Sequence, residues 1–212
     1  MRLWSGFAGK KRWTQNLARE YTFSMTLSIR PEQTTDFDTI HDLVRDAFAS
    51  LTETTGDEQD FVAAMRGHKG YIPELALVAE EQGGIVGYVM LTETRVEGVE
   101  GGAPVLLLAP ICVAPERHSK NVGTTLMHEV FRRAVAQGYD AIFLAGNPNY
   151  YTRFGFLPTV SFGIDHTMPV PDKCIMALEL VPGALAGRKG TILLTGHTTC
   201  ASALSSSRKA RA

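Results

Sequence analysis

The sequence has few cysteines, no long apolar run and almost no net charge, and each of these absences excludes a class of protein. Its three cysteines are odd in number and lack the spacing of metal ligands, which argues against a disulfide framework and against a zinc site. Cys112 and Cys174 stand in apolar runs and are expected to be core thiols, so a reducing, cytoplasmic setting without a bound metal fits best. No apolar stretch approaches the roughly 20 residues of a membrane span.

Charge and motif content exclude further classes. With 21 basic and 22 acidic residues the formal net charge is −1, which gives no general case for binding nucleic acid or a membrane surface. No Gly-Lys-Ser or Gly-Lys-Thr follows a predicted strand, and no Gly-x-Gly-x-x-Gly is present, so neither a P-loop nucleotidase nor a Rossmann dinucleotide site is expected. What remains is a globular chain whose 44% hydrophobic content is enough for a core.

The 212 residues suffice for one domain, and the composition divides them into three parts. Residues 1–24 are basic and are interpreted as a disordered extension or as a start placed upstream of the true one at Met25; a basic amphipathic helix is the alternative. Residues 25–182 carry the regular patterns of the core domain. Residues 183–212 are a C-terminal extension, expected to add a turn and one peripheral strand before a disordered end.

Hydrophobic periodicity predicts a mixed sheet with flanking helices. Strands are expected at residues 26–30, 75–81, 85–95, 104–113, 141–145 and 174–180, and helices near residues 37–48, 58–65, 122–137 and 149–154. The second, third and fourth strands follow one another through short Gly-rich turns, which indicates an antiparallel meander. The helix between the fourth and fifth strands indicates a parallel, right-handed crossover. Residues 159–172 are expected to be irregular.

The strand at 104–113 organises the rest of the chain, because it is nearly all aliphatic, as expected of a strand covered on both faces. Pro110 lies in its middle. Proline cannot donate a hydrogen bond to a neighbouring strand, so it belongs at a bulge or where the neighbour is absent. We therefore expect this strand to part from its neighbour near Pro110, and the backbone groups left unpaired could bind an extended ligand as a strand would.

Between this strand and the next helix lies a loop of small and basic residues, in which Arg117 and Lys120 supply positive charge. A helix N-terminus leaves backbone N–H groups free and carries a positive partial charge, so a loop of this kind leading into one is typical of a phosphate site. An ordinary strand-to-helix turn with a solvated run of charges is the alternative interpretation.

Three stretches carry a resemblance to a known family: Ile111-Cys112-Val113-Ala114-Pro115, the loop positions His118, Asn121 and Gly123, and Asn147-Pro148-Asn149-Tyr150-Tyr151-Thr152-Arg153-Phe154-Gly155-Phe156. With the order of elements, they resemble the GNAT superfamily of acetyl-CoA-dependent N-acetyltransferases over roughly residues 26–181. Within it the chain looks most like the YhbS-like bacterial subgroup. The third stretch is the most specific, because its Tyr151 stands four residues before a Gly-Phe pair.

The resemblance implies an α/β (α+β) fold, with helices flanking a mixed, mostly antiparallel sheet whose central strands splay apart. It implies an acyltransferase that transfers acetyl from acetyl-CoA to a primary amine by direct attack, with no metal. The acceptor is expected to be a small molecule, not nucleic acid and not a membrane, and a homodimer is one candidate assembly because dimers are common among similar proteins. A non-catalytic acetyl-CoA-binding or regulatory protein is the alternative function.

By the same resemblance, the pantetheine arm of acetyl-CoA would pair with the strand end, and its pyrophosphate would bind the loop. The residues implied are Ile111, Cys112 and Val113 for the arm, His118, Ser119, Lys120, Asn121, Val122, Gly123 and Thr124 for the phosphates, and Asn147 and Tyr151 beside them. The loop departs from the family at His118, where Gln or Arg is usual, and at Ser119 and Asn121, where glycine is usual. Asparagine is the non-glycine residue most tolerant of a left-handed backbone, so the loop conformation is expected to survive at Asn121.

Tyr151 is implied as the general acid that protonates the leaving thiolate; a packed aromatic side chain is the other interpretation. The resemblance does not identify the general base, because leucines occupy the part of the central strand in which many relatives place a glutamate. Candidates of equal standing are Glu93, Glu97, Asp165 and His166.

Overall fold

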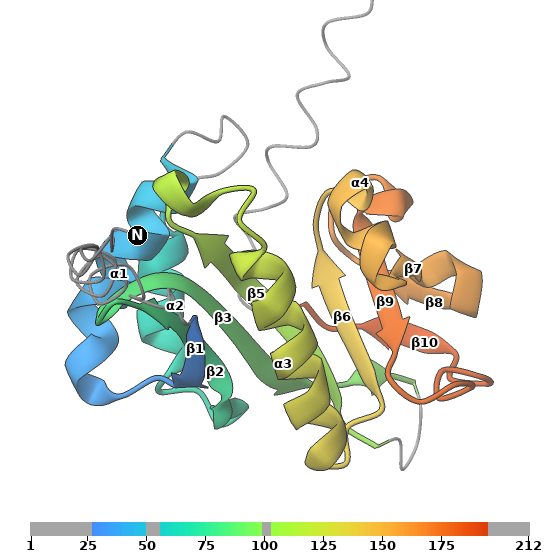
Figure 1. The fold of residues 1–212 in the computed structure, drawn as a ribbon. Helices are drawn as coiled ribbons and strands as arrows, with labels where there is room; N and C mark the ends of the chain where they lie inside the picture. The colour runs from blue at the N-terminus through green and yellow to red at the C-terminus, as the bar shows by residue number, and fades with distance from the viewer. Residues whose placement is uncertain (1–26, 50–55, 99–102, 195–212) are drawn as a thin grey trace, which may run out of the picture.

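The computed structural model describes residues 27–49, 56–98 and 103–194. Its main feature is a seven-stranded sheet in the order β1-β2-β3-β5-β6-β9-β7, with helices on both faces (Figure 1). Neighbouring strands are antiparallel except for β5 and β6, which run parallel. The mixed, mostly antiparallel sheet expected from the sequence is therefore confirmed. The basic extension at 1–24 and the chain end expected to be disordered lie outside the described residues.

The boundaries of the elements follow the predicted ones closely. The strands of the main sheet are Ser28–Pro31 (β1), Tyr71–Glu81 (β2), Gly84–Thr94 (β3), Val105–Val113 (β5), Ala141–Ala145 (β6), Leu157–Pro158 (β7) and Ile175–Glu179 (β9). The helices are Phe37–Phe48 (α1), Glu58–Met65 (α2), Val122–Ala136 (α3) and Pro148–Tyr151 (α4). Short 3-10 turns lie at Thr34–Asp36, Pro115–Arg117, Thr152–Phe154, Thr159–Phe162 and Asp172–Cys174. The last predicted helix is thus split between α4 and a 3-10 turn.

The alternation of side chains along the strands decides which helix covers which face of the sheet. The face under α1 and α2 presents Ala76, Val78, Tyr88, Met90 and Cys112. The opposite face presents Leu75, Leu77, Val89, Leu91, Leu106 and Leu108, and the apolar stripe of α3 packs on it through Val122, Leu126, Val130 and Ala134. β5 is therefore enclosed from both sides, as its aliphatic sequence predicts.

β5 is bulged at its proline. Leu108 of β5 faces Leu91 of β3. The next pair along the ladder is Ile111 with Val89, so three steps of β5 match two steps of β3. The extra residue is the mark of a β-bulge, and it lies at Pro110, where the sequence predicted either a bulge or a missing neighbour.

β5 also parts from β6, which is the second outcome that Pro110 predicted. Pairing between the two strands covers only Leu106 with Ile142 and Leu107 with Phe143. Beyond Leu107, β5 continues as the partner of β3, while β6 continues as the partner of β9. Figure 1 shows the two strands diverging in this half of the sheet. The β6-facing side of β5 beyond Leu107 has no strand partner among the described residues.

A second, smaller sheet was not predicted. It has three strands, Val96–Glu97 (β4), Gly190–Ile192 (β10) and Ile164–His166 (β8), in the order β4-β10-β8. β10 is the peripheral strand expected within residues 183–194. The expectation that residues 159–172 are irregular was wrong, because β8 and two 3-10 turns lie there. Strands of two or three residues are too short to produce a periodic pattern.

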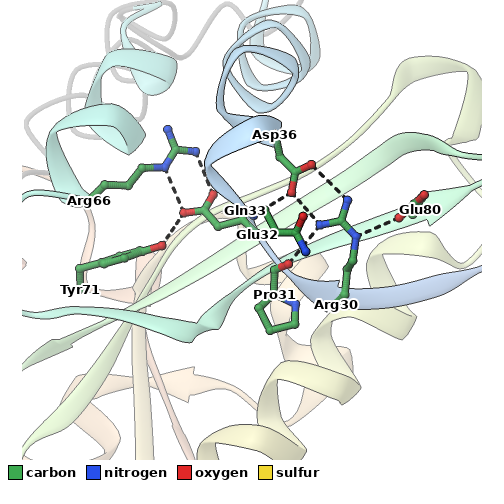
Figure 2. Close-up of polar contacts among 8 residues, drawn as sticks. All are labelled: Arg30, Pro31, Glu32, Gln33, Asp36, Arg66, Tyr71 and Glu80. Carbon is green, nitrogen blue, oxygen red and sulfur yellow. Dashed lines mark hydrogen bonds and ion pairs between the residues drawn. The ribbon is translucent and has the colours of Figure 1, made fainter.

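Glu32, immediately after β1, holds the C-terminal end of α2. Its carboxylate accepts hydrogen bonds from Nε and Nη2 of Arg66, at 3.0 and 2.8 Å, and from the Tyr71 hydroxyl at 2.7 Å (Figure 2). The Glu32 side chain is 1% exposed and that of Arg66 12%. Arg66 Cζ also lies 3.7 Å from the ring centroid of Phe37, at the start of α1. These contacts fix α2 against β2 and α1.

Candidate active site

The connection from β5 to α3 is shaped by two left-handed residues. Ser119 has a φ of 61° and Asn121 a φ of 63°. These are the two loop positions at which the resemblance expects glycine, and the left-handed backbone predicted for Asn121 is confirmed. A left-handed backbone costs an ordinary residue of the order of 1–2 kcal/mol, and asparagine tolerates it better than most residues. The loop therefore keeps a glycine-like path without glycine.

The N-terminus of α3 is open to an anion. The helix begins directly after Asn121, whose carbonyl oxygen accepts hydrogen bonds from the backbone N–H and the hydroxyl of Thr125, both at 2.9 Å. The Asn121 side chain itself caps none of the helix's first N–H groups. Lys120 is exposed and forms no ion pair with a carboxylate in the described part of the chain. Unfilled N–H groups, the helix dipole and a nearby cation together suit a phosphate.

Two side chains tie the first part of this loop to the sheet. His118 Nε2 lies 3.0 Å from the carbonyl oxygen of Val113, so the ring is held against the end of β5. Arg117 donates from Nε to the carboxylate of Glu81, which joins the loop to the end of β2. The backbone N–H of His118 donates to the carbonyl oxygen of Pro115 at 3.2 Å, so a contact of His118 with a phosphate would come from its other ring nitrogen.

α4 brings two tyrosines to the start of α3. Asn147 caps this short helix, because its Oδ1 accepts a hydrogen bond from the backbone N–H of Asn149 at 3.0 Å. The Tyr150 hydroxyl lies 3.0 Å from the point at which a Cβ on Gly123 would stand, so it touches the first turn of α3. The ring of Tyr151 stands edge-on to that of Tyr150, with centroids 4.9 Å apart. The motif with the Gly-Phe pair thus lies against the loop, as the resemblance expects.

Tyr151 also packs on the end of β6, where the chain has glycine. A Cβ at Gly146 would stand 2.4 Å from Cε2 of the Tyr151 ring, closer than real Cβ atoms approach. On its other side the ring meets Phe156 edge-on, with centroids 5.8 Å apart. The position of Tyr151 therefore depends on the absence of a side chain at Gly146.

Gly146→Ala should displace the Tyr151 ring and lower the free energy of unfolding by about 1–3 kcal/mol, the usual cost of overpacking. Urea denaturation followed by circular dichroism measures this change. Gly84→Ala is the matched control, because the nearest atom to its Cβ would be 3.7 Å away, and its effect should stay within about 0.5 kcal/mol. Equal effects of the two changes would show that Tyr151 does not depend on Gly146.

The two cysteines within the described residues are core thiols, as predicted. Cys112 is 6% exposed and Cys174 1% exposed. Burial raises the pKa of the Cys112 thiol to about 12. A thiol with so high a pKa carries almost no thiolate near neutral pH and is a poor nucleophile.

The four candidate bases lie in two places, neither of them at the loop. Glu93 accepts a hydrogen bond from the hydroxyl of Tyr139 at 2.9 Å, and Tyr139 follows the C-terminal end of α3. At 1.5 Å per residue that end is about 22 Å from the loop at the helix N-terminus, so Glu93 is no neighbour of the loop. Glu97, Asp165 and His166 all belong to the second sheet.

Sequence reasoning missed the burial of a carboxylate that has no salt-bridge partner, that of Glu58 at the first position of α2. The residue is 7% exposed, and neither carboxylate oxygen has a hydrogen-bond partner among the described residues. Burial raises its pKa, and the like charge of the adjacent Asp57 adds to this; the backbone N–H groups of Gly56 and Glu58, which lie nearby without forming a hydrogen bond to it, lower the pKa by less. The available signal was its spacing, because Glu58, Val62 and Met65 form the buried stripe of α2.

A seven-stranded sheet that opens between two parallel strands, with a phosphate-type loop at the opening and a tyrosine-bearing short helix beside it, defines an acyltransferase fold. The sequence profile described as "Acetyltransferase (GNAT) domain" matches residues 28–159, well over half of the chain. The chain therefore belongs to the GNAT family of acetyltransferases. Within the described residues, no helix is long and apolar enough to cross a membrane.

Relatives and solved structures agree with this assignment. The "Uncharacterized N-acetyltransferase YjhQ" of Escherichia coli (strain K12) is 29% identical over 148 residues, 68% of this chain and 78% of that protein. The "Uncharacterized N-acetyltransferase YhbS" of the same strain is 26% identical over 124 residues, 58% of this chain and 73% of that protein.

Two solved structures share the fold. The structure of YhbS from Escherichia coli in complex with CoA has a TM-score of 0.71 at 24% identity, and the match covers 80% of this chain and 89% of that one. A GNAT family acetyltransferase from Brucella melitensis in complex with acetyl-CoA has a TM-score of 0.64 at 25% identity, covering 79% of this chain and 95% of that one. This chain is similar to both structures in fold.

Proposed function

We propose that this enzyme transfers the acetyl group of acetyl-CoA to a primary amine of a small molecule, by direct attack of the amine on the thioester. The observation that carries the proposal is that β5 loses β6 as a partner on the same side of the molecule where the open N-terminus of α3 follows β5. The first feature leaves backbone groups for an extended arm, and the second leaves N–H groups for a pyrophosphate. The two similar structures that hold CoA and acetyl-CoA support this cosubstrate.

In this proposal the cosubstrate runs along β5 and into the loop. The pantetheine arm pairs with Ile111, Cys112 and Val113, and the pyrophosphate rests on the N–H groups of residues 119–124, with the His118 side chain beside them. Lys120 supplies positive charge there. Asn147 and Tyr151 lie at the side of the arm. The Tyr150 hydroxyl, already in contact with the first turn of α3, adds a hydrogen-bond donor to the same cradle.

The chemistry needs an oxyanion site and a general acid. Attack of the amine on the thioester carbon forms a tetrahedral oxyanion, and a backbone N–H near Ile111 or Cys112 would stabilise it. Collapse breaks the carbon–sulfur bond, and the Tyr151 hydroxyl gives its proton to the leaving thiolate. The buried, protonated thiol of Cys112 is unsuited to form an acyl-enzyme, which favours direct transfer over a covalent intermediate.

Two measurements test the proposal. Calorimetric titration should show that acetyl-CoA binds, and a thiol-release assay over a panel of primary amines should show turnover with at least one of them. Binding of acetyl-CoA without turnover of any amine would favour the non-catalytic alternative. Failure to bind acetyl-CoA would contradict the proposal itself.

The left-handed backbone at Asn121 gives a sharper test of the phosphate loop. Asn121→Gly should bind acetyl-CoA as tightly as the wild type or slightly better, because glycine enters the left-handed region freely. Asn121→Val should lose about tenfold in affinity, since a left-handed β-branched residue costs of the order of 1–2 kcal/mol. Calorimetric titration of both variants measures the difference. Equal affinity of Asn121→Val and the wild type would mean that the loop does not hold the phosphates.

A further inference from the structure

The carboxylate of Glu58 is buried without a partner, in contrast to the other buried carboxylates. Glu32, Asp36 and Glu58 are the buried acidic residues of the described part of the chain. Glu32 is paired with Arg66, at 2.8 Å, and Asp36 with Arg30, at 2.6 Å. Within the same residues Glu58 has no cation against its oxygens and forms no hydrogen bond through them; the backbone N–H groups of Gly56 and Glu58 lie near enough only to lower its pKa. A buried carboxylate without a partner destabilises the folded protein, so its presence indicates a role in function and not in stability.

Its position relates Glu58 to the opening of the sheet. Phe61, one helical turn further along α2, packs against two clusters of buried side chains at once. One lies under α1 and includes Cys112. The other lies beside the parted strands and contains Ala109 of β5, with Ala145 of β6 packed at its edge. The N-terminal turn of α2 therefore spans the region where β5 leaves β6, on the face of the sheet opposite to α3.

The C-terminal end of the same helix is rigidly held. Arg66, which follows α2, is fixed by Glu32 and lies on the ring of Phe37. The register of α2 on the sheet is thereby set at one end, and its buried stripe carries this register to Glu58 at the other end. A carboxylate held in this way is preorganised, as a group that acts on a substrate has to be.

We propose that Glu58 is the acceptor-side carboxylate of this enzyme: it binds the ammonium group of the acceptor and takes its proton before attack. The proposal rests on the acetyl transfer proposed above and supplies the base that the sequence did not reveal. It places the base and the general acid on opposite faces of the sheet. Glu58 lies on the face covered by α2, and Tyr151, on α4, lies on the face covered by α3. The amine then approaches the thioester through the opening between β5 and β6 from the side opposite to the cofactor loop.

The protons balance over one turnover. The acceptor R–NH3⁺ gives one proton to the Glu58 carboxylate, and the neutral amine forms the carbon–nitrogen bond. The tetrahedral intermediate breaks its carbon–sulfur bond, and Tyr151 gives its proton to the thiolate, so that CoA leaves as a thiol. The second proton lost by the nitrogen returns to Tyr151, and Glu58 releases its proton to water. The sum is R–NH3⁺ plus acetyl-CoA giving the amide, CoA and one proton.

The surroundings of Glu58 indicate the class of amine. One unpaired carboxylate can compensate one positive charge. The adjacent Asp57 carboxylate is exposed to solvent, and the neighbours of Glu58 on the buried stripe of α2 are apolar. The segment after α4 adds Phe162 and Met168, which pack on the same cluster as Phe61. A monoamine on an apolar or aromatic body therefore fits better than a polyamine or an amino acid, whose further charges would be left without partners.

The test compares Glu58→Gln with Asp60→Asn and the wild type. Asp60 stands on the same helix, but its side chain is 72% exposed, so it controls for a carboxylate-to-amide change on α2. Thiol release from acetyl-CoA is measured with phenethylamine, spermidine and glycine from about pH 6 to about pH 9. We expect phenethylamine to be the best of the three amines. Glu58→Gln should lower kcat at least about 10²-fold and remove the acidic limb of the pH profile, while Asp60→Asn leaves both unchanged.

Folding and cofactor binding supply readouts that do not depend on turnover. Burial raises the pKa of Glu58 in the folded state. The wild type is therefore at its most stable, relative to Glu58→Gln, below the ordinary glutamate pKa of 4.5. It loses this stability as the pH rises through the pKa of Glu58 in the folded state. Glu58→Gln should therefore melt at a higher temperature than the wild type near neutral pH and at about the same temperature near pH 4. It should bind acetyl-CoA with unchanged affinity. A lower melting temperature together with weaker binding would make Glu58 structural and overturn the proposal.

The remaining outcomes of these experiments each test one part of the proposal. Unchanged turnover and pH profile in Glu58→Gln would overturn the role of Glu58, whereas a wild type that does not bind acetyl-CoA would overturn the proposed function first. A preference for spermidine or glycine would overturn the assigned class of amine. If none of the three amines turns over, the carboxyl ¹³C resonance of Glu58 in the CoA complex decides: added phenethylamine should shift it and lower the Glu58 pKa. No response of that resonance would overturn the proposal.

Discussion

Arg66→Met should lower the free energy of unfolding by about 3–5 kcal/mol, because it leaves the carboxylate of Glu32 buried with only the Tyr71 hydroxyl as a partner. For a domain of this size that is a fall of roughly 6–20 °C in melting temperature. Methionine keeps much of the volume of the arginine stem, so the loss reports the charge and its hydrogen bonds more than packing. Urea denaturation and thermal melting measure both quantities.

Two further variants isolate the cause. Arg45→Met removes an arginine whose side chain is 50% exposed and which pairs with Asp42 and Asp46 on the surface of α1. It should change the stability little, because solvent screens exposed ion pairs. The double change Glu32→Leu with Arg66→Met should recover most of the loss, because replacing a buried ion pair by apolar side chains is often close to neutral. If Arg66→Met costs no more than Arg45→Met, the pair does not anchor α2.

Tyr151→Phe should lower kcat about 10²-fold, the lower end of what general acid catalysis contributes. The change removes one oxygen atom and keeps the ring, which packs between Gly146 and Phe156, so folding and acetyl-CoA affinity should be almost unchanged. The pattern of a lower kcat with unchanged binding identifies a group that acts in the transition state. The assay is thiol release, with the amine that the panel identifies as the best acceptor.

Tyr150→Phe is the matched control for this prediction. It makes the same change on the neighbouring residue, whose hydroxyl touches the first turn of α3. Loss of that hydroxyl should weaken acetyl-CoA binding by a few fold, the worth of one hydrogen bond, and leave kcat nearly unchanged. A large fall in kcat for Tyr150→Phe but not for Tyr151→Phe would transfer the role of general acid to Tyr150.

The parts of this molecule that the sequence predicts are those with a local physical cause. Pro110 cannot donate to a ladder, and β5 is bulged there and leaves β6 just before it. Asn121 tolerates a left-handed backbone, and it has one. The stripe of α3 follows the helical period over four turns. Each of these conclusions needs only the residue, its neighbours and the geometry of the backbone.

The parts that the sequence does not predict depend on contacts between distant segments. β4 and β8 are too short to show a period, and each becomes a strand only by pairing with β10. Glu58 reads as an ordinary acidic residue in the first turn of a helix. Its burial is visible only once α2 is laid on the sheet. Glu93 suggested a base near the central strand, and the structure places it at the far end of α3 instead.

The two outer edges of the seven-stranded sheet are formed by its two shortest strands. β1 ends in Pro31 and has four residues; β7 ends in Pro158 and has two. Short edge strands with proline are poor templates for another chain, which protects a sheet against edge-to-edge aggregation. The long strands are all interior, and the β6-facing side of β5 beyond Leu107 has no strand partner among the described residues. The sheet thus has short, proline-ended strands at its two edges and a strand with an unpaired side at its centre, where a molecule the width of a single extended chain could pair with it.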